Sequence, residues 1–243
     1  MRCPITITAI ENACSGNSLA GVKSVSLANF GVIDTITYEY QIIDTKTAEE
    51  YQALTPTEKA LYEQEGDSYV KYATAFGEKI KSSVKNITLV NGEKFKTFGF
   101  KPQTASFTQT LQYSENASFW QQDISLVFSK QDSAKRLSIM SIAQAELTAI
   151  VEDNNGKYWL CAINYPMIMN SGDVTSGTAY SDASQYAITL SASDLELALE
   201  LPKEVFETLV DTTRPTTTNV TPNNGGTQNS GGTQNSGGSG FVG

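Results

Sequence analysis

The sequence of 243 residues contains no histidine. Histidine is the commonest general base, it activates Ser and Cys nucleophiles, and it binds many catalytic metals. Paired carboxylates would then have to carry acid–base chemistry. The sequence offers three such pairs, Glu49 with Glu50, Glu63 with Glu65, and Glu196 with Glu200. All three fall where we expect solvated side chains, whereas a general acid needs burial to raise its pKa. We therefore expect no enzyme and no cofactor.

Basic residues are also scarce. The chain has 17 Lys and Arg against 26 Asp and Glu, which gives a formal net charge of −9 and a pI near 4.6. Proteins that grip nucleic acid release counterions by presenting clustered basic side chains, so this class is disfavoured. A negative surface remains compatible with a conduit through which nucleic acid slides without sticking. With 40% hydrophobic residues the chain can fill a globular core.

Cysteines and long apolar runs are few as well. A zinc site at Cys3 and Cys14 would need two further ligands, and without histidine the only other sulfur ligand is Cys161, in a predicted strand, so we expect no metal. The first apolar run, residues 5–10, is broken by two threonines and followed by Glu11, which is unlike a signal peptide or a membrane span. We expect synthesis in a reducing cytoplasm, thiols rather than disulfides, and no membrane contact.

Period-two patterns predict a mainly β fold. Two strands are expected around residues 29–34, and residues 105–113 alternate an apolar face with a polar one made of Ser106, Thr108, Thr110 and Gln112. Residues 118–129 alternate likewise. In residues 195–201 all four leucines fall on one face and Glu196 and Glu200 on the other. These strands predict a β-sandwich or barrel.

Asn-Gly pairs indicate where strands turn. Asn155-Gly156 predicts a hairpin in residues 149–163, with Leu147, Ala149 and Val151 on the same face as Tyr158, Leu160 and Ala162. Asn91-Gly92 predicts a second hairpin, between residues 86–90 and 93–100. Cross-strand packing explains these residues without any chemistry.

Helical signals are confined to two places. Residues 134–145, capped by Asp132 or Ser133, carry a broad apolar face that we expect to pack on a sheet. An insertion at about residues 41–85 contains two capping boxes, Thr47 with Glu50 and Thr55 with Glu58. They predict two short helices, the second ending near Gly66.

The end of the chain differs in composition. Residues 211–243 hold the hexad GGTQNS twice and few apolar side chains, so we expect a disordered tail after a domain of residues 1–210. A linker without a partner and an adaptable arm ending in Phe241 and Val242 both fit this composition.

The layout of residues 21–209 resembles that of phage major tail tube proteins of long-tailed phages, which are similar to the tube proteins of contractile injection systems. The resemblance rests on the strands, the early insertion, the helix at 134–145, the "VEDNNGKYWL" hairpin and the "LELALELP" ending. It implies a β-sandwich whose copies form hexameric rings that stack into a tube in the virion tail. DNA then passes through the lumen, and other tail proteins are partners.

The resemblance also suggests which residues make the contacts. The insertion would join successive rings, because tyrosines are favoured at interfaces. The candidates for this contact are Tyr51, Leu54, Leu61, Tyr62, Tyr69 and Tyr72. An alternative is that these tyrosines only cover the domain. Glu196 and Glu200 are the candidates for an acidic lumen lining.

Two other functions remain open. A neck or tail-terminator protein would share the fold but form one ring without stacking. A carbohydrate-binding, adhesive β-sandwich of the virion would use Tyr158, Trp159 and Tyr180 as stacking platforms. The alternative for these aromatics is packing in the core, because Tyr158 alternates in register with Leu160.

Overall fold

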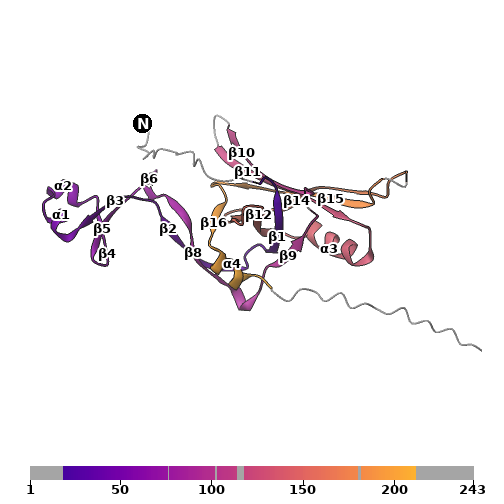
Figure 1. Cartoon of the computed structure of the whole chain (residues 1–243), viewed down its shortest axis with the longest axis horizontal. Coiled ribbons are helices and arrows are strands. Elements are labelled where there is room, and N and C mark those ends of the chain that lie inside the picture. Colours follow the sequence, from indigo (N-terminus) through magenta and orange to yellow (C-terminus); the bar gives the residue numbers. More distant parts are fainter. Residues whose placement is uncertain (1–18, 76, 102, 114–117, 180–181, 212–243) are drawn as a thin grey trace, which may run out of the picture. The chain divides into compact units, whose positions relative to one another are not determined.

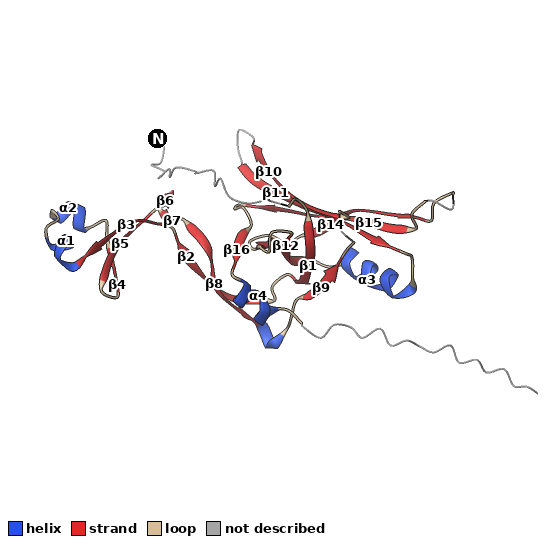
Figure 2. Cartoon of the chain, in the orientation of Figure 1, coloured by secondary structure: helices blue, strands red, loops and turns tan. Residues whose placement is uncertain are grey.

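The computed structural model describes residues 19–75, 77–101, 103–113, 118–179 and 182–211. The chain divides into two units, residues 1–212 and 213–243, and every described element belongs to the first. The fold is mainly β, as the alternating patterns predict (Figures 1 and 2). The predicted tail lies outside the described residues apart from Asp211.

The elements up to residue 99 are β1 (Val22–Asn29), β2 (Ile33–Tyr40), β3 (Ile42–Thr47), α1 (Ala48–Gln52), α2 (Pro56–Lys59), β4 (Glu63–Glu65), β5 (Ser68–Tyr72), β6 (Thr74–Ala75), β7 (Glu78–Lys79), β8 (Lys81–Leu89), the 3-10 turn η1 (Val90–Gly92) and β9 (Lys96–Gly99). The later elements are β10 (Ala105–Tyr113), β11 (Ser118–Ser129), α3 (Ser133–Ala143), β12 (Leu147–Asp153), β13 (Tyr158–Cys161), β14 (Ile168–Thr175), β15 (Gln185–Asp194), β16 (Leu199–Leu201) and α4 (Lys203–Leu209).

Two sheets form a β-sandwich. The larger has seven strands in the order β2-β8-β16-β13-β12-β1-β9, and the smaller has four in the order β10-β11-β15-β14. One hydrophobic cluster takes side chains from both, among them Val25 and Val151 of the larger sheet and Ile124 and Leu190 of the smaller. The sheets therefore pack face to face, and the main core lies between them.

The seven-stranded sheet is also covered on its other face. A second cluster joins Ile150 and Leu160 to Phe206 and Leu209 of α4. As a result residues 147–152 of β12 are all buried, because each of their two faces meets a core. The sequence patterns did not predict α4, which is only seven residues long.

The hairpin β12–β13 turns one residue earlier than predicted. The Gly156 amide donates to the Asp153 carbonyl at 3.1 Å, and the Asp153 amide to the Lys157 carbonyl at 2.9 Å. Gly156 has a φ of 76°, so the loop is a turn followed by a glycine bulge. Val151 therefore pairs with Trp159 and Ile150 with Leu160. The predicted sharing of a face by Ala149, Val151 and Leu160 is wrong, because a one-residue shift exchanges the two faces.

Other pairings also differ from expectation. The predicted hairpin at Asn91-Gly92 is wrong, because β8 pairs with β2 and β16 while β9 pairs with β1. Helix α2 ends at Lys59, and the stretch before Gly66 is strand β4. Strand β16 covers only residues 199–201, so Leu195 and Leu197 are 61% and 44% exposed instead of lying on one buried strand face.

Helix α3 begins where predicted, with Asp132 as its N-cap. The Asp132 carboxylate accepts from the Lys135 amide at 2.8 Å. Its predicted broad apolar contact is narrower in the structure: Ile142 is buried, but Leu137 and Met140 are 61% and 46% exposed. The helix packs beside β14 and the rim of the main core, so only one stripe of its surface is covered (Figure 1).

The insertion folds as a small module, residues 42–72, which we call the tyrosine module. Both capping boxes are formed, at Thr47 and Thr55, as predicted. Strands β3, β5 and β4 make a three-stranded sheet that carries α1 and α2. The backbone of Gln41 links the module to the β2–β8 ribbon, since it donates to Ile80 and accepts from Ala73 at 2.9 and 2.8 Å.

Candidate functional site

The four-stranded sheet has one face in the core and an outer face on which hydroxyl and amide side chains predominate, which we call the polar face. Its polar residues on β10, β11 and β15 are Ser106, Thr108, Thr110, Gln112, Gln121, Asp123, Ser125, Thr189, Ser191 and Ser193, and the apolar Phe119, Val127 and Ala187 share the face. The register aligns them in rows, such as Thr108 beside Asp123 and Asp123 beside Ser191. The alternation in residues 105–113 indicated the first strand of this face.

Hydrogen bonds between strands tie the polar face together. Ser193 donates to the Gln121 side chain at 3.1 Å, and Gln121 donates to Asp123 at 3.0 Å. The residues named above include one carboxylate, Asp123, and neither Lys nor Arg. A polyanion therefore finds on this face no positive charge to which it could adsorb.

Both edges of this sheet are free in the part of the chain that the structure describes. Strands β10 and β14 each pair on one side only. Free edges expose rows of unpaired N–H and C=O groups, which can pair with a strand of another chain. Leu111 at 50% exposure and Val174 at 58% lie on these two edge strands. The edges are therefore candidate assembly surfaces.

Three of the predicted interface tyrosines pack on one another inside the tyrosine module. The Tyr51 and Tyr69 rings stack with centroids 3.7 Å apart, and Tyr62 meets Tyr51 edge-on at 6.3 Å. The Tyr62 hydroxyl donates to Asp44, and this bond raises the pKa of Tyr62 to about 12. The packing favours the alternative that these tyrosines stabilise the insertion itself.

Tyr72 lies apart from that cluster. Its ring lies against Tyr40 and beneath the Lys79 ammonium, 4.2 Å from the ring centroid. Lys79 also pairs with Glu63 at 2.6 Å. Burial and a hydrogen bond to Glu65 raise the pKa of Tyr72 to about 12. Tyr72 therefore stabilises the junction between the tyrosine module and the rest of the domain.

Most of the exposed apolar side chains of the tyrosine module are not among the predicted contact residues. Leu54 is half-buried, whereas Leu61 is 54% exposed. Ile42 and Ile43, which the sequence reasoning missed, are 47% and 36% exposed. Adjacent residues of a regular strand point to opposite sides, and that signal could have identified one of the two isoleucines as exposed, although a register shift between Ile42 and Asp44 interrupts the alternation here. Leu61, Ile42 and Ile43 are therefore the apolar side chains that the module can bury in a contact with another subunit.

Glu196 and Glu200 are both held in ion pairs. Glu196 meets Lys81 at 2.7 Å, and Glu200 pairs with Lys157. Only Glu200 lies in a strand, β16 of the seven-stranded sheet, so the two do not share a strand face as predicted. Their place in a lumen remains a prediction.

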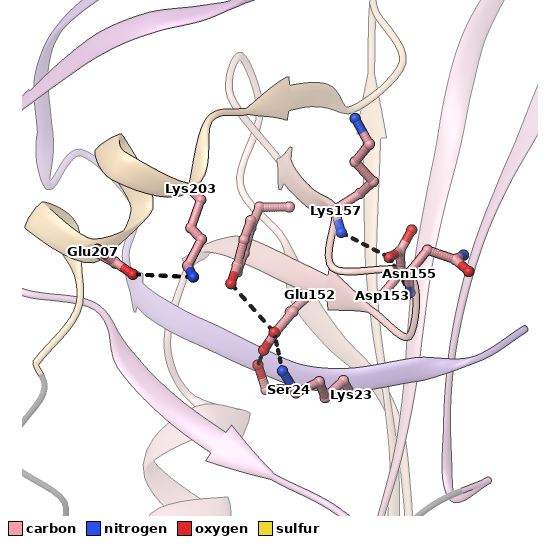
Figure 3. Close-up of polar contacts among 9 residues, drawn as sticks. Lys23, Ser24, Glu152, Asp153, Asn155, Lys157, Lys203 and Glu207 are labelled. Carbon is pink, nitrogen blue, oxygen red and sulfur yellow. Dashed lines mark hydrogen bonds and ion pairs between the residues drawn. The ribbon is translucent and has the colours of Figure 1, made fainter. Parts of the chain in front are cut away.

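The most buried acid at the hairpin is Glu152, which is 8% exposed (Figure 3). It accepts from Lys23 at 2.5 Å, from Ser24 at 2.6 Å and from Tyr158 at 3.3 Å. The bond to Glu152 raises the pKa of Lys23, and burial raises the pKa of Tyr158. With three donors the carboxylate is satisfied, so the cluster holds β1, β12 and β13 together.

The aromatics considered for glycan stacking are engaged within the fold where they are described. Tyr158 is 7% exposed and stacks on Phe206 at 4.2 Å. Trp159 is partly buried against the main core and donates to Asp153 at 3.3 Å. Tyr180 lies outside the described residues. Tyr158 thus has no free ring face, as the core interpretation expects.

Within the described ranges, no three Cys, Asp or Glu side chains come together as metal ligands. No helix in those ranges has the length and apolar character needed to cross a membrane. Burial raises the pKa of the Cys161 thiol, which keeps it protonated and unreactive. Comparisons with protein-family models, with curated proteins and with solved structures found no match.

Proposed function

We propose that this protein is a structural subunit of a phage tail tube, whose copies form hexameric rings that stack into a conduit for DNA. The polar face carries this proposal. It spans three adjacent strands with hydroxyl and amide groups, three apolar residues (Phe119, Val127 and Ala187), one carboxylate and no basic side chain. Such a surface suits the wall of a channel that a polyanion must cross without adsorbing.

Ring closure would use the edges of the same sheet. Pairing β10 of one copy with β14 of the next is a heterologous contact, which generates a closed ring when the rotation between copies closes. It also continues the polar face from one copy to the next. Main-chain hydrogen bonds then supply affinity at an edge that would otherwise favour aggregation.

Stacking of rings would use the tyrosine module. Its internal packing makes it a defined projection instead of a loose loop, and Leu61, Ile42 and Ile43 give it an exposed apolar surface. Interfaces bury such side chains at their centre and leave charged residues at the rim. A neck or terminator protein would close one ring without this contact.

Assembly is tested with the purified full chain. Light scattering after size exclusion, over a range of concentrations, and negative-stain images should show rings and tubes. Single rings without tubes would favour the neck protein. A monomer at every concentration that is also absent from virion tails would contradict the proposal.

The wall assignment is tested by adding positive charge. Thr108→Lys and Ser125→Lys place cations on the polar face, and we expect DNA ejection from assembled virions to slow. Thr35→Lys in β2 is the control, because it adds the same charge at an exposed site outside both the polar face and the tyrosine module. Glu196→Lys and Glu200→Lys test the predicted lumen residues in parallel. Unchanged ejection in the polar-face variants would remove that face from the channel wall.

A further inference from the structure

The sandwich is open at the β10 edge. A cavity of about 340 Å³ lies there between the two sheets. Phe107 and Gln109 of β10 form one side, Val151 and Trp159 of the seven-stranded sheet form another, and the chain segment 19–22 completes the wall. Apolar side chains of both sheets thus border an opening at a free strand edge.

The point where the described chain begins is fixed beside this opening. Leu19 donates to the Asn155 side chain at 2.9 Å and accepts from it at 3.2 Å. Asn154 donates to the Ala20 carbonyl at 2.7 Å. These two asparagines of the β12–β13 turn hold the start of the segment, and residues 1–18 precede it outside the described residues.

The free edge of β10 offers both polar and apolar contacts. The Val127 amide donates to the Thr104 carbonyl at 3.0 Å, which shows that even-numbered residues here bond to β11. Because bonding direction alternates along an antiparallel strand, the backbone groups of Phe107, Gln109 and Leu111 point away from β11. On the same odd-numbered face Leu111 is 50% and Tyr113 81% exposed.

We propose that residues 5–10 of the same chain add a strand to this free edge of β10. Their sequence, Ile-Thr-Ile-Thr-Ala-Ile, is uncharged and alternates with period two from Ile5 to Ala9, after which Ile10 interrupts the pattern. In this arrangement Ile5, Ile7 and Ala9 cover the opening and the exposed Leu111, while Thr6 and Thr8 extend the polar face. The pattern is similar to that of β10, whose inward residues are apolar except for Gln109 and whose outward residues are Ser, Thr and Gln112.

Residues 11–18 connect residues 5–10 to Leu19, and this short tether favours the chain's own segment over a second copy at the β10 edge. Residues 11–18 are eight residues that span at most about 28 Å when extended. Strand β10 has nine residues and is about 30 Å long, so nearly the whole edge is within reach of Leu19. A short tether gives an effective concentration in the millimolar range. A second copy would have to compete with it.

Amide hydrogen exchange on the monomeric full chain tests this docking. The amides of Phe107, Gln109 and Leu111 should exchange about tenfold or more slowly in the full chain than in a chain lacking residues 1–18. The amides of Thr108 and Thr110, which bond to β11 in both chains, serve as the internal control. Equal exchange at the odd-numbered positions would overturn the proposal.

Point variants separate the strand from a general effect of the deletion. Ile7→Asp places a charge toward the opening and should abolish the protection. Thr8→Asp places the same charge on the solvent side and should retain most of it. If the two variants behave alike, residues 5–10 do not dock in the proposed orientation.

A disulfide distinguishes the chain's own segment from a second copy. In a Cys3→Ser, Cys14→Ser background, Thr6→Cys is combined in turn with Ser106→Cys, Thr108→Cys, Thr110→Cys or Gln112→Cys. One pair should oxidise within a single chain, because cross-strand Cβ atoms approach within disulfide range. Thr6→Cys with Thr175→Cys on β14 is the control. Disulfides only between chains, or none above the control, would contradict docking in cis.

A consequence for assembly rests on the proposed function. If rings close through β10, docking of residues 5–10 and pairing with a neighbouring copy compete for the same edge. Deletion of residues 1–18 should then speed the association of subunits. Exchange on the monomer tests the docking alone, so a failure of ring formation and a failure of docking remain distinguishable.

Discussion

Asp194 shows at the scale of one residue how the sandwich is joined. It is 2% exposed and ends β15. Its carboxylate accepts from the Ile163 amide at 3.0 Å, from Asn164 at 3.2 and 2.7 Å, and from Leu195 at 2.7 Å. One side chain of the four-stranded sheet thereby holds the loop that follows β13 of the other sheet.

Removing this carboxylate should be costly. Asp194→Ala leaves several partly buried N–H groups without an acceptor, and we expect a loss of about 3 kcal/mol in the free energy of unfolding. Urea denaturation measures it. Asp34→Ala, at an exposed position of β2, should change stability by no more than about 0.5 kcal/mol. Similar losses for the two variants would show that the Asp194 contacts contribute nothing.

Tyr62 gives a prediction in alkaline solution. Its hydrogen bond to Asp44 raises its pKa from 10.0 to about 12, so the native state favours the neutral phenol. This contribution to stability is complete below pH 10 and is lost as the pH rises toward 12. In an ultraviolet tyrosinate titration, Asp44→Ala should move one step from about 12 toward 10. Glu65→Ala should move the separate step of Tyr72. A titration unchanged by Asp44→Ala would argue against the bond.

At the scale of elements, one turn decides the faces of a whole hairpin. The bulge needs Gly156 at a φ of 76°, where a side chain is strained. Gly156→Ala should lower the free energy of unfolding by about 1 kcal/mol. Gly99→Ala in β9 is the matched control, because no atom lies within 4 Å of its added Cβ and its φ is outside the left-handed region. Thermal unfolding should separate the two variants, and equal midpoints would contradict the turn geometry.

At the scale of the whole molecule, the tyrosine module can be removed at a natural junction. The Ala73 amide donates to the Gln41 carbonyl at 2.8 Å, so the two ends of the module lie side by side. We expect replacement of residues 42–72 by Asn-Gly to leave the sandwich folded, with cooperative unfolding, because a two-residue turn closes adjacent strands. Under the proposed function this variant forms rings and no tubes.

A matched variant keeps the module and changes only its exposed apolar surface. Leu61→Asp combined with Ile42→Asp should reduce tube formation and leave ring formation intact, since both side chains are exposed and carry little of the fold. Electron microscopy counts rings and tubes. Tubes of normal length from the deleted chain would exclude the module as the joint between rings.

The sequence by itself determined the features that depend on residues close together in the chain. The capping boxes at Thr47 and Thr55, the cap at Asp132 and the alternation of residues 105–113 follow from local hydrogen bonds and local periodicity. These signals were enough for the mainly β fold and for one strand of the polar face. They hold because each involves only a few neighbouring residues.

Only the tertiary structure decided the pairing of strands and the surroundings of side chains. Strand β9 pairs with β1, 71 residues away at Ser26 and Thr97, although a turn signal favoured its neighbour β8. From composition we predicted that Tyr51, Tyr62 and Tyr69 contact another subunit. In the structure their rings pack on one another. The polar face exists only because β10, β11 and β15 align in one register. Such contacts depend on which edges and apolar faces remain free once the whole chain has packed, and no local pattern records that.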